Sequence, residues 1–247
     1  MDIDVMKLLH EVDPYKDYMW RGDIGIDLQG WGGHPEFFRR MIELTAPKLI
    51  IEVGTWKGRS ALAMAQILDD ISKEIVSPES TRTWWCEETK IMCVDTWLGA
   101  TEMWTNHDDE KRYKSLRLVN GYPSLYYTFM NNVVGRAKQH RIVPFPQTSQ
   151  NAARVLRKAG VKAQLIYIDA SHEEQDVKFD LWAWKDMLDE GGIMFGDDYC
   201  DYWPGVKSAV NAFAERKAMC VQTRRYENPG SAPSDYWVLS KDGIDLP

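Results

Sequence analysis

The chain has 247 residues, of which 44% are hydrophobic and 27% charged, and its formal net charge is −7. This length is sufficient for one large domain with its own core. A net acidic chain lacks the basic face that neutralises phosphates, so we expect no nucleic-acid partner. No apolar run approaches the about 20 residues of a membrane span, so we expect no membrane association either.

The cysteines and aromatic residues set further bounds. Four cysteines are scattered without a CxxC pair, which argues against a zinc site or a redox dithiol. Reduced thiols predict a cytoplasmic protein. Eleven tryptophans and eleven tyrosines are expected mainly to pack in the core and at interfaces, which leaves a homo-oligomer open. A stacking surface for a sugar or an aromatic ring is the alternative.

The predicted elements begin with an N-terminal helical cap at residues 1–47 and continue in a domain at 48–247, the two forming one structural unit. After residue 48, strand-like and helix-like segments alternate, which is typical of a mostly parallel sheet with helices on both faces. The predicted strands are Lys48–Val53, Ile91–Asp95, Arg141–Phe145, Gln164–Asp169, Gly192–Gly196, Met219–Thr223 and Tyr236–Ser240. The predicted helices are Arg59–Asp69, Tyr126–His140, Asn151–Ala159, Glu173–Leu188 and Pro204–Lys217.

This alternation predicts an α/β fold: a Rossmann-like, doubly wound, mostly parallel seven-stranded sheet. Its last strand is expected to be antiparallel, because the stretch YENPGSAPS before it indicates a loop and not a helix. Two segments interrupt the alternation. Residues 70–90 lengthen the first crossover as surface elaboration, and residues 98–125 form a polar, aromatic loop after the second strand. Loops at the carboxyl ends of strands carry ligands in such sheets, so we expect 98–125 to be a substrate lid.

The stretch LIIEVGTWKGRSALAMA joins the first predicted strand to the first helix of this domain. Gly54 would allow a tight turn, and Gly58 would allow a close approach to the backbone. Neither G-x-G-x-x-G nor G-x-x-x-x-G-K-[ST] is present, so a dinucleotide or ATP fits poorly. Glu52 at the strand end would repel a pyrophosphate but could pair with a cation.

This segment resembles the first motif of class I S-adenosylmethionine-dependent methyltransferases, acid-x-Gly-x-x-x-Gly, whose cofactor carries a cationic sulfonium and amino group. Asp95, in CVDTW, ends the second strand, where that family places an acid on the ribose hydroxyls. It lies farther along the chain than the usual about 20 residues, and the 70–90 insertion accounts for the excess. The resemblance implies cofactor contacts from Glu52, Gly54, Thr55, Gly58, Ser60, Asp95, Thr96, Thr148, Ser149 and Asp169.

Purely structural roles are alternatives for several of these residues. Asp95 and Glu52 could cap a helix or hold a turn. Thr148 and Ser149 follow the third strand, where the resembling family contacts adenine, and Ser149 could equally be a helix N-cap.

Three aspartates follow two further predicted strands. Asp169 ends one strand, and Asp197 and Asp198 end the next. Neighbouring parallel strands lie about 4.8 Å apart, so the three carboxylates could converge at one rim. A divalent cation such as Mg²⁺ would offset their repulsion. Alternatively, one member of the pair caps or turns and leaves two ligands.

Here the resemblance narrows to the metal-dependent O-methyltransferases, both the catechol O-methyltransferase-like enzymes and the sugar O-methyltransferases related to macrocin O-methyltransferase. It covers Lys48 to about Tyr199 and implies Asp169, Asp197 and Asp198 as metal ligands, with His172 and Asp169 as catalytic residues. His172 stands where the catechol enzymes carry a lysine base, and this departure favours the sugar relatives. Histidine, with an unperturbed pKa near 6.5, suits a base at neutral pH. A structural residue at a helix N-terminus is the alternative for His172.

We therefore predict an S-adenosylmethionine-dependent, divalent-metal-assisted O-methyltransferase acting on a hydroxyl of a sugar or a glycosylated small molecule. A phenolic or catechol acceptor is the first alternative. A Rossmann oxidoreductase is disfavoured by the missing G-x-G-x-x-G. A catalytically silent module that keeps the cofactor pocket is the alternative from another class.

Overall fold

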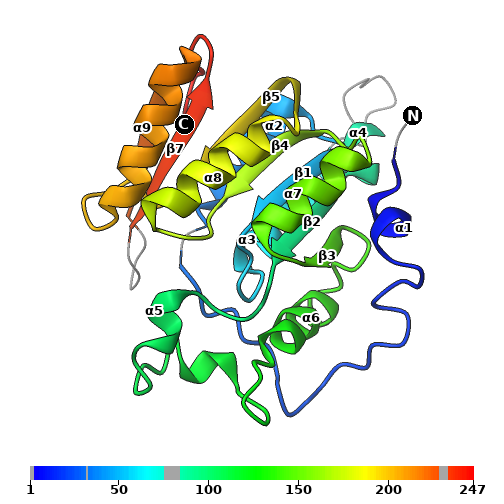
Figure 1. Cartoon of the computed structure of the whole chain (residues 1–247). Helices are drawn as coiled ribbons and strands as arrows, with labels where there is room; N and C mark the ends of the chain where they lie inside the picture. Colours follow the sequence, from blue (N-terminus) through cyan, green and yellow to red (C-terminus); the bar gives the residue numbers. More distant parts are fainter. Residues whose placement is uncertain (1–2, 32, 75–83, 228–232) are drawn as a thin grey trace.

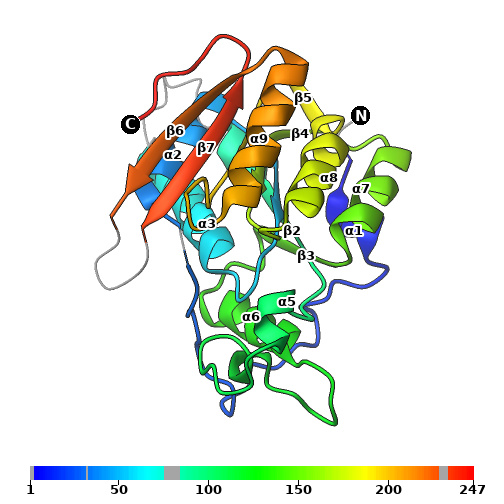
Figure 2. The ribbon, with the colours of Figure 1, turned by 60° about the vertical axis from the view of Figure 1, so that its left-hand side comes forward.

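A computed structural model describes residues 3–31, 33–74, 84–227 and 233–247. A seven-stranded sheet with the order β3-β2-β1-β4-β5-β7-β6 forms its centre (Figure 1). The strands β1 to β5 pair in parallel, while β7 pairs antiparallel with both β5 and β6 (Figure 2). This confirms the predicted Rossmann-like sheet with an antiparallel last strand. The strands are β1 (Leu49–Val53), β2 (Lys90–Asp95), β3 (Ile142–Pro146), β4 (Ala163–Ile168), β5 (Leu188–Gly196), β6 (Cys220–Tyr226) and β7 (Ser234–Ser240).

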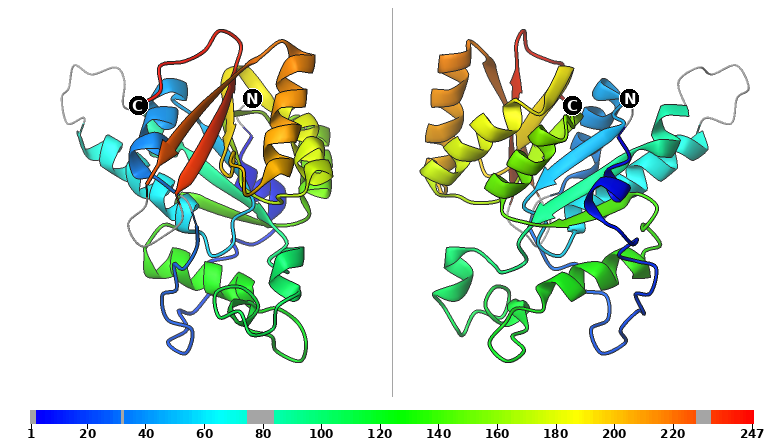
Figure 3. Two further views of the ribbon diagram at one scale, coloured as in Figure 1. Left: turned by 90° about the vertical axis from the view of Figure 1, so that its left-hand side faces the viewer. Right: turned by 45° about the vertical axis from the view of Figure 1, so that its right-hand side comes forward.

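Helices cover both faces of the sheet, as predicted. One face carries α2 and α3, and the other carries α7, α8 and α9 (Figure 3). The helices are α1 (Val5–Leu9), α2 (Pro35–Thr45), α3 (Arg59–Glu74), α4 (Trp84–Glu88), α5 (Thr101–Trp104), α6 (Leu125–Gly135), α7 (Ser149–Lys158), α8 (Glu174–Lys185) and α9 (Pro204–Lys217), with a 3₁₀ turn η1 at Lys114–Leu116.

Two predicted helices were too long at their carboxyl ends. The helix α6 ends at Gly135, and Ala137 shortly after it has the left-handed φ of 54°. The helix α8 ends at Lys185 because Leu188 already belongs to β5, whose pairing with β4 begins there. The surrounding sheet therefore overrides the local helical pattern at the start of β5.

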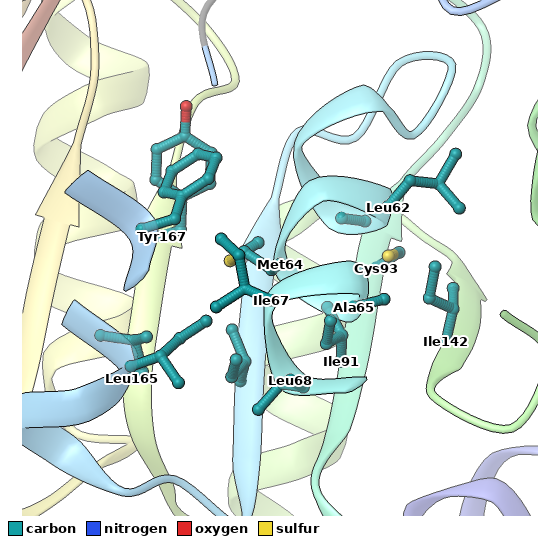
Figure 4. Close-up of a cluster of buried hydrophobic side chains, with 14 of the residues drawn as sticks. Leu62, Met64, Ala65, Ile67, Leu68, Ile91, Cys93, Ile142, Leu165 and Tyr167 are labelled. Carbon is teal, nitrogen blue, oxygen red and sulfur yellow. The ribbon is translucent and has the colours of Figure 1, made fainter. Parts of the chain in front are cut away.

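The core follows from the pleat of the central strands, which are buried on both faces. All five residues of β1 are buried. Successive residues such as Ile50 and Ile51 point to opposite faces of the sheet and pack against different helical layers. Figure 4 shows Leu62 and Leu68 of α3 in the same apolar cluster as Ile91 of β2. Burying each such side chain contributes about 1.5–3 kcal/mol, so this layer fixes α3 and the loop before it.

The segment before β1 is divided between the two faces and one end of the sheet. Val5 of α1 packs with the cluster on the α7 side, and Phe37 and Phe38 of α2 are fully buried on the other face. Between these helices the chain runs along the end of the sheet where α5 and α6 also lie (Figures 1 and 3).

The lengthened first crossover contains the last turn of α3 and the short helix α4, and residues 75–83 of the predicted insertion lie outside the described residues. Within the described chain, every helix is too short or too polar to span a membrane.

Candidate functional site

The first element of the site is the loop between β1 and α3. Gly54 has a φ of 86°, and a Cβ added there would lie 2.0 Å from the carbonyl oxygen of Asp169. Gly58 has a φ of 84°, and its Cβ would lie 2.9 Å from the Phe129 ring. Any side chain at these positions would force β1 away from β4 or the loop away from α6. The two glycines therefore allow three elements to meet at one point.

Asp95 at the end of β2 holds this loop in place. Its Oδ2 accepts hydrogen bonds from the backbone N–H groups of Thr55 at 2.9 Å and Trp56 at 2.8 Å, and its Oδ1 accepts one from Trp97 at 2.7 Å. Burial raises the pKa of Asp95, and the backbone hydrogen bonds oppose that shift. Asp95 thus has a turn-holding role while it also lines the cavity described below.

Glu52 lies beneath the loop and is fully buried. One oxygen accepts from the Ser60 hydroxyl, and the other accepts from Thr55 Oγ1 at 2.9 Å. Burial raises the pKa of Glu52 to about 8, so the side chain is mainly protonated at neutral pH. Glu52 does not reach the cavity wall, and direct pairing with a bound cation would require the loop to open.

A cavity of about 530 Å³ opens at the carboxyl ends of the parallel strands, at the switch point between β1 and β4. Most of the predicted site residues line it. They are Gly54, Thr55, Ser60, Asp95, Thr96, Thr148, Ser149, Asp169, His172, Asp197 and Asp198, whereas Glu52 and Gly58 lie behind the wall.

Thr148 and Ser149 enter the cavity from the start of α7. Thr148 is the N-cap residue, with its Oγ1 accepting from Asn151 N–H at 3.2 Å. The N-cap role considered for Ser149 was therefore one residue off. Ser149 instead donates to the buried Asp180 of α8 and accepts from Trp184 Nε1 at 2.9 Å.

The three aspartates meet at the ends of β4 and β5. Asp169 Oδ2 accepts from the Tyr167 hydroxyl at 2.8 Å, and Asp197 Oδ1 accepts from the N–H groups of Asp198 at 2.8 Å and Asp235 at 2.7 Å. Burial, followed by the charge of Asp198, raises the pKa of Asp169 to about 7. Burial and the charge of Asp169 likewise raise the pKa of Asp197. All three aspartates line the same rim of the cavity, so their charges repel one another when they are ionised.

The donor chemistry suits a hard divalent cation, because Mg²⁺ prefers carboxylate oxygens. The arrangement is not that of a formed metal site. In the part of the chain that the structure describes, no group of three or more His, Cys, Asp and Glu side chains is positioned to hold a metal ion. Asp198 turns toward His172, and the predicted three-carboxylate set would need to rearrange to bind one.

His172 is held between carboxylates from two elements. Its Nε2 lies 3.0 Å from Asp198 Oδ2, and its Nδ1 lies 3.4 Å from Glu102 Oε1 of α5. Burial lowers the pKa of His172, but the hydrogen bonds with Asp198 and Glu102 outweigh it and raise the pKa to about 9. The ring also stacks on Trp203, with centroids 3.7 Å apart. His172 is therefore positioned, and protonated, by its neighbours.

The comparisons with known proteins agree with this arrangement. Residues 51–199 match the family model described as a methyltransferase domain. The chain belongs to this methyltransferase family. The match confirms the resemblance to class I methyltransferases and spans the Gly54 loop, the three aspartates and His172. No curated protein matches the chain.

Solved structures of other methyltransferases share the fold. An O-methyltransferase from Bacillus cereus in complex with S-adenosylhomocysteine is 10% identical, with a TM-score of 0.54 and coverage of 83% of this chain and 79% of that one. The O-methyltransferase TomG from Streptomyces achromogenes, involved in tomaymycin synthesis and solved with S-adenosylmethionine, is 11% identical, with a TM-score of 0.53 and coverage of 83% and 78%. At these identities the likeness extends to the fold alone.

This methyltransferase also carries two site contacts that the sequence analysis missed. Glu102 lies in the predicted lid, and no residue pattern there identifies it as the partner of His172. Lys57, between the two loop glycines, is 1% exposed, and its Nζ donates to Asp27 at 2.8 Å, Gln29 at 3.0 Å and Ser115 at 3.0 Å. Lys57 thus connects the loop to the N-terminal segment and to residues 98–125, several of which line the cavity.

Proposed function

We propose that this methyltransferase carries the methyl group of S-adenosylmethionine to a hydroxyl of a sugar or a glycosylated small molecule. The observation that carries the proposal is a single cavity with two different ends. The Gly54 loop, Asp95 and Thr148 line one end, and Asp169, His172 and Asp198 line the other. Its volume of about 530 Å³ lies within the range usual for cofactor sites.

The loop end suits the cofactor. The Gly54 turn brings backbone atoms to the cavity wall, and the amino end of α3 provides a positive dipole and first-turn N–H groups that have no partner within the helix. Asp95 accepts three N–H groups, and two carboxylate oxygens offer about four acceptor sites. Asp95 therefore keeps acceptor capacity for ribose hydroxyls, and Thr148 and Ser149 would contact the adenine.

The acid end suits the acceptor. The hydroxyl oxygen would form a bond with the methyl carbon while the carbon–sulfur bond breaks and the sulfonium becomes a neutral thioether. The hydroxyl proton would pass to His172. Because a protonated imidazole cannot accept a proton, this role requires His172 first to release its proton to solvent, which becomes favourable when its contacts with Asp198 and Glu102 open and its pKa falls. Holding the two reactants at attack distance would supply much of the acceleration.

We also propose that Asp169, Asp197 and Asp198 hold a divalent cation, with Mg²⁺ as the best match to oxygen donors. When bound, the cation would lower the pKa of the acceptor hydroxyl. Three mutually repelling carboxylates at one rim support this proposal. The departure of His172 from the catechol-type lysine favours a sugar over a phenolic acceptor.

The cofactor half is tested by calorimetric titration of S-adenosylhomocysteine into the purified protein, followed by a methyl-transfer screen that begins with sugars and includes catechols. Micromolar binding and transfer to a sugar hydroxyl are expected. Absence of binding would overturn the proposal, whereas binding without transfer to any acceptor would favour the silent module.

The metal half is tested by Mn²⁺ titration monitored by electron paramagnetic resonance, which needs no turnover. Asp169→Asn should weaken Mn²⁺ binding by about ten-fold or more, since it removes one charged ligand. Asp176→Asn is the matched control, because Asp176 lines the cavity outside the three-aspartate set. Equal Mn²⁺ affinity in wild type and Asp169→Asn would contradict the metal proposal.

A further inference from the structure

Two arginines line the cavity close to the Gly30–Trp31 segment. Arg59 is the first residue of α3, and its Nη1 donates to the carbonyl of Gly30 at 3.0 Å. Arg112 comes from residues 98–125, and its Cζ lies 5.0 Å from the centroid of the Trp31 ring. All three side chains line the cavity. Helix, loop and N-terminal segment thus bring two positive charges to one stretch of the cavity wall, with Arg112 against the Trp31 ring and Arg59 on the neighbouring Gly30 carbonyl.

Both guanidinium groups keep donors available. Over the described residues, each donates a hydrogen bond from one nitrogen only, Arg59 to Gly30 and Arg112 to Asp109 at 3.3 Å. The Arg112–Asp109 pair is partly exposed, and such pairs are easily exchanged for another partner. An arginine carries five N–H donors in a planar fork that matches the oxygens of a carboxylate or a phosphate. The two side chains therefore have the chemistry of an oxyanion site.

The other charged residues that line the cavity favour binding of an anionic group at Arg59 and Arg112 over any other part of the wall. The remaining wall carries acidic side chains, namely Asp95, Glu102, Asp169, Asp176, Asp197 and Asp198. An anionic group would be repelled from that wall and attracted to Arg59 and Arg112. A ligand with one charged and one neutral end would therefore bind in a single orientation, with its hydroxyls toward the acid end.

We propose that Arg59, Arg112 and Trp31 form a subsite for an oxyanion of the acceptor, so that the acceptor is an acidic sugar derivative, either a sugar phosphate or a sugar carboxylate. The proposal rests on the proposed function and deepens it. The oxyanion is bound by the guanidinium forks, and Trp31 covers the adjoining apolar face of the sugar ring. This places the acceptor hydroxyls, and not the anionic group, beside His172.

Calorimetry on the protein saturated with S-adenosylhomocysteine tests the subsite. Glucose 1-phosphate, glucuronate and neutral glucose serve as probes for phosphate, carboxylate and uncharged sugar. At least one anionic probe should bind about ten-fold or more tightly than glucose, the effect of about one charge-assisted hydrogen bond. The better anionic probe identifies the source of the oxyanion. Equal binding of all three, or binding of none, overturns the subsite.

The variants Arg59→Gln and Arg112→Gln, alone and together, show whether the arginines carry the effect. The double variant should lose about ten-fold or more in affinity for the anionic probe while its affinity for S-adenosylhomocysteine stays within about two-fold of wild type. Lys111→Gln is the matched control, since Lys111 is an exposed neighbour outside the cavity wall. Thermal unfolding confirms that the variants fold.

The contrary outcomes separate this inference from the proposed function. Unchanged binding of the anionic probe in the double variant overturns the subsite. A loss confined to S-adenosylhomocysteine assigns the arginines to the cofactor carboxylate and also overturns it. Failure of the wild type to bind S-adenosylhomocysteine overturns the proposed function itself, and titration of the anionic probe into the cofactor-free protein still measures the subsite.

Discussion

The two ends of the cavity differ in how well their charged groups are satisfied. At the loop end, Asp95 accepts three backbone N–H groups and holds the Gly54 turn. At the acid end, burial and the charge of Asp198 raise the pKa of Asp169, burial and the charge of Asp169 raise the pKa of Asp197, and Asp198 is paired with His172. The loop end is preorganised by the fold, whereas the acid end has an excess of negative charge. We infer that the cofactor binds to groups whose hydrogen bonds are already formed. The acceptor, by contrast, binds beside carboxylates whose negative charge must first be neutralised.

The two ends of the cavity meet at Gly54 and Asp169, and we expect substitutions there to destabilise the protein most. In Gly54→Ala the new Cβ would lie 2.0 Å from the Asp169 carbonyl oxygen, at a φ of 86°. The left-handed conformation alone costs about 1–2 kcal/mol, and the backbone clash adds to it. We expect a loss of about 4 kcal/mol or more in the free energy of unfolding, measured by urea denaturation.

Gly160→Ala separates the clash from the backbone conformation. Gly160 has a φ of 72°, and a Cβ there would meet nothing within 4 Å. This variant should lose only about 1–2 kcal/mol. Similar losses in the two variants would show that β1 and β4 can separate without cost, contrary to a preorganised loop end.

Glu52 should make the stability of the loop end depend on pH. Burial raises its pKa to about 8 from an ordinary 4.5, so the folded state retains a proton that the unfolded state releases. The stabilisation is complete below pH 4.5 and disappears as the pH rises through 8. Between pH 5.5 and 7.5 the wild type should lose about 3 kcal/mol more than Glu52→Gln does, at about 1.4 kcal/mol per pH unit.

Urea denaturation at several pH values measures this difference. Other buried acids, such as Asp180 with its pKa raised by burial to about 7, contribute equally to wild type and variant and therefore cancel. Glu36→Gln, at an exposed position of α2, should retain the wild-type slope. Parallel curves for wild type and Glu52→Gln would mean that Glu52 is not protonated in the fold.

Asp95→Asn tests how much the carboxylate contributes to the loop. An asparagine offers one acceptor oxygen, so its amide nitrogen must face either Trp97 N–H or the N–H groups of Thr55 and Trp56. At least one backbone donor then loses its partner, at a cost of about 1–3 kcal/mol. Asp108→Asn, at an exposed position, should stay within about 0.5 kcal/mol of wild type in the same urea assay. An equally small effect of Asp95→Asn would show that the loop does not depend on Asp95.

The contrast between the two ends of the cavity also explains which parts of the fold and the site can be predicted from the sequence. Apolar runs such as LIIEV and the glycines beside them predict strands and turns, because those depend on local patterns and burial. The same strand ends place Asp95, Asp169 and Asp197, since a parallel sheet brings its carboxyl ends to one edge.

Contacts made by the loops do not follow from such patterns. Glu102 reaches His172, Lys57 reaches Asp27, and Arg112 reaches Trp31 through tertiary packing of segments far apart in the chain. The predicted helix at α8 was too long at its carboxyl end for the same reason, because pairing of β5 with β4 overrides the local helical pattern.

The smallest expected effect has the opposite sign and comes from the acid end. At pH 8 Asp169 is mainly ionised, although burial and the charge of Asp198 raise its pKa to about 7. Since the folded state favours the proton, its stabilisation is present below pH 3.8 and is lost as the pH rises through 7. Asp169→Asn removes that charge and can still accept from the Tyr167 hydroxyl. We therefore expect the metal-free variant to be about 1 kcal/mol more stable than wild type at pH 8, measured by urea denaturation in EDTA. A variant less stable than wild type would show that the carboxylate is satisfied where it lies, and the two ends of the cavity would then be alike.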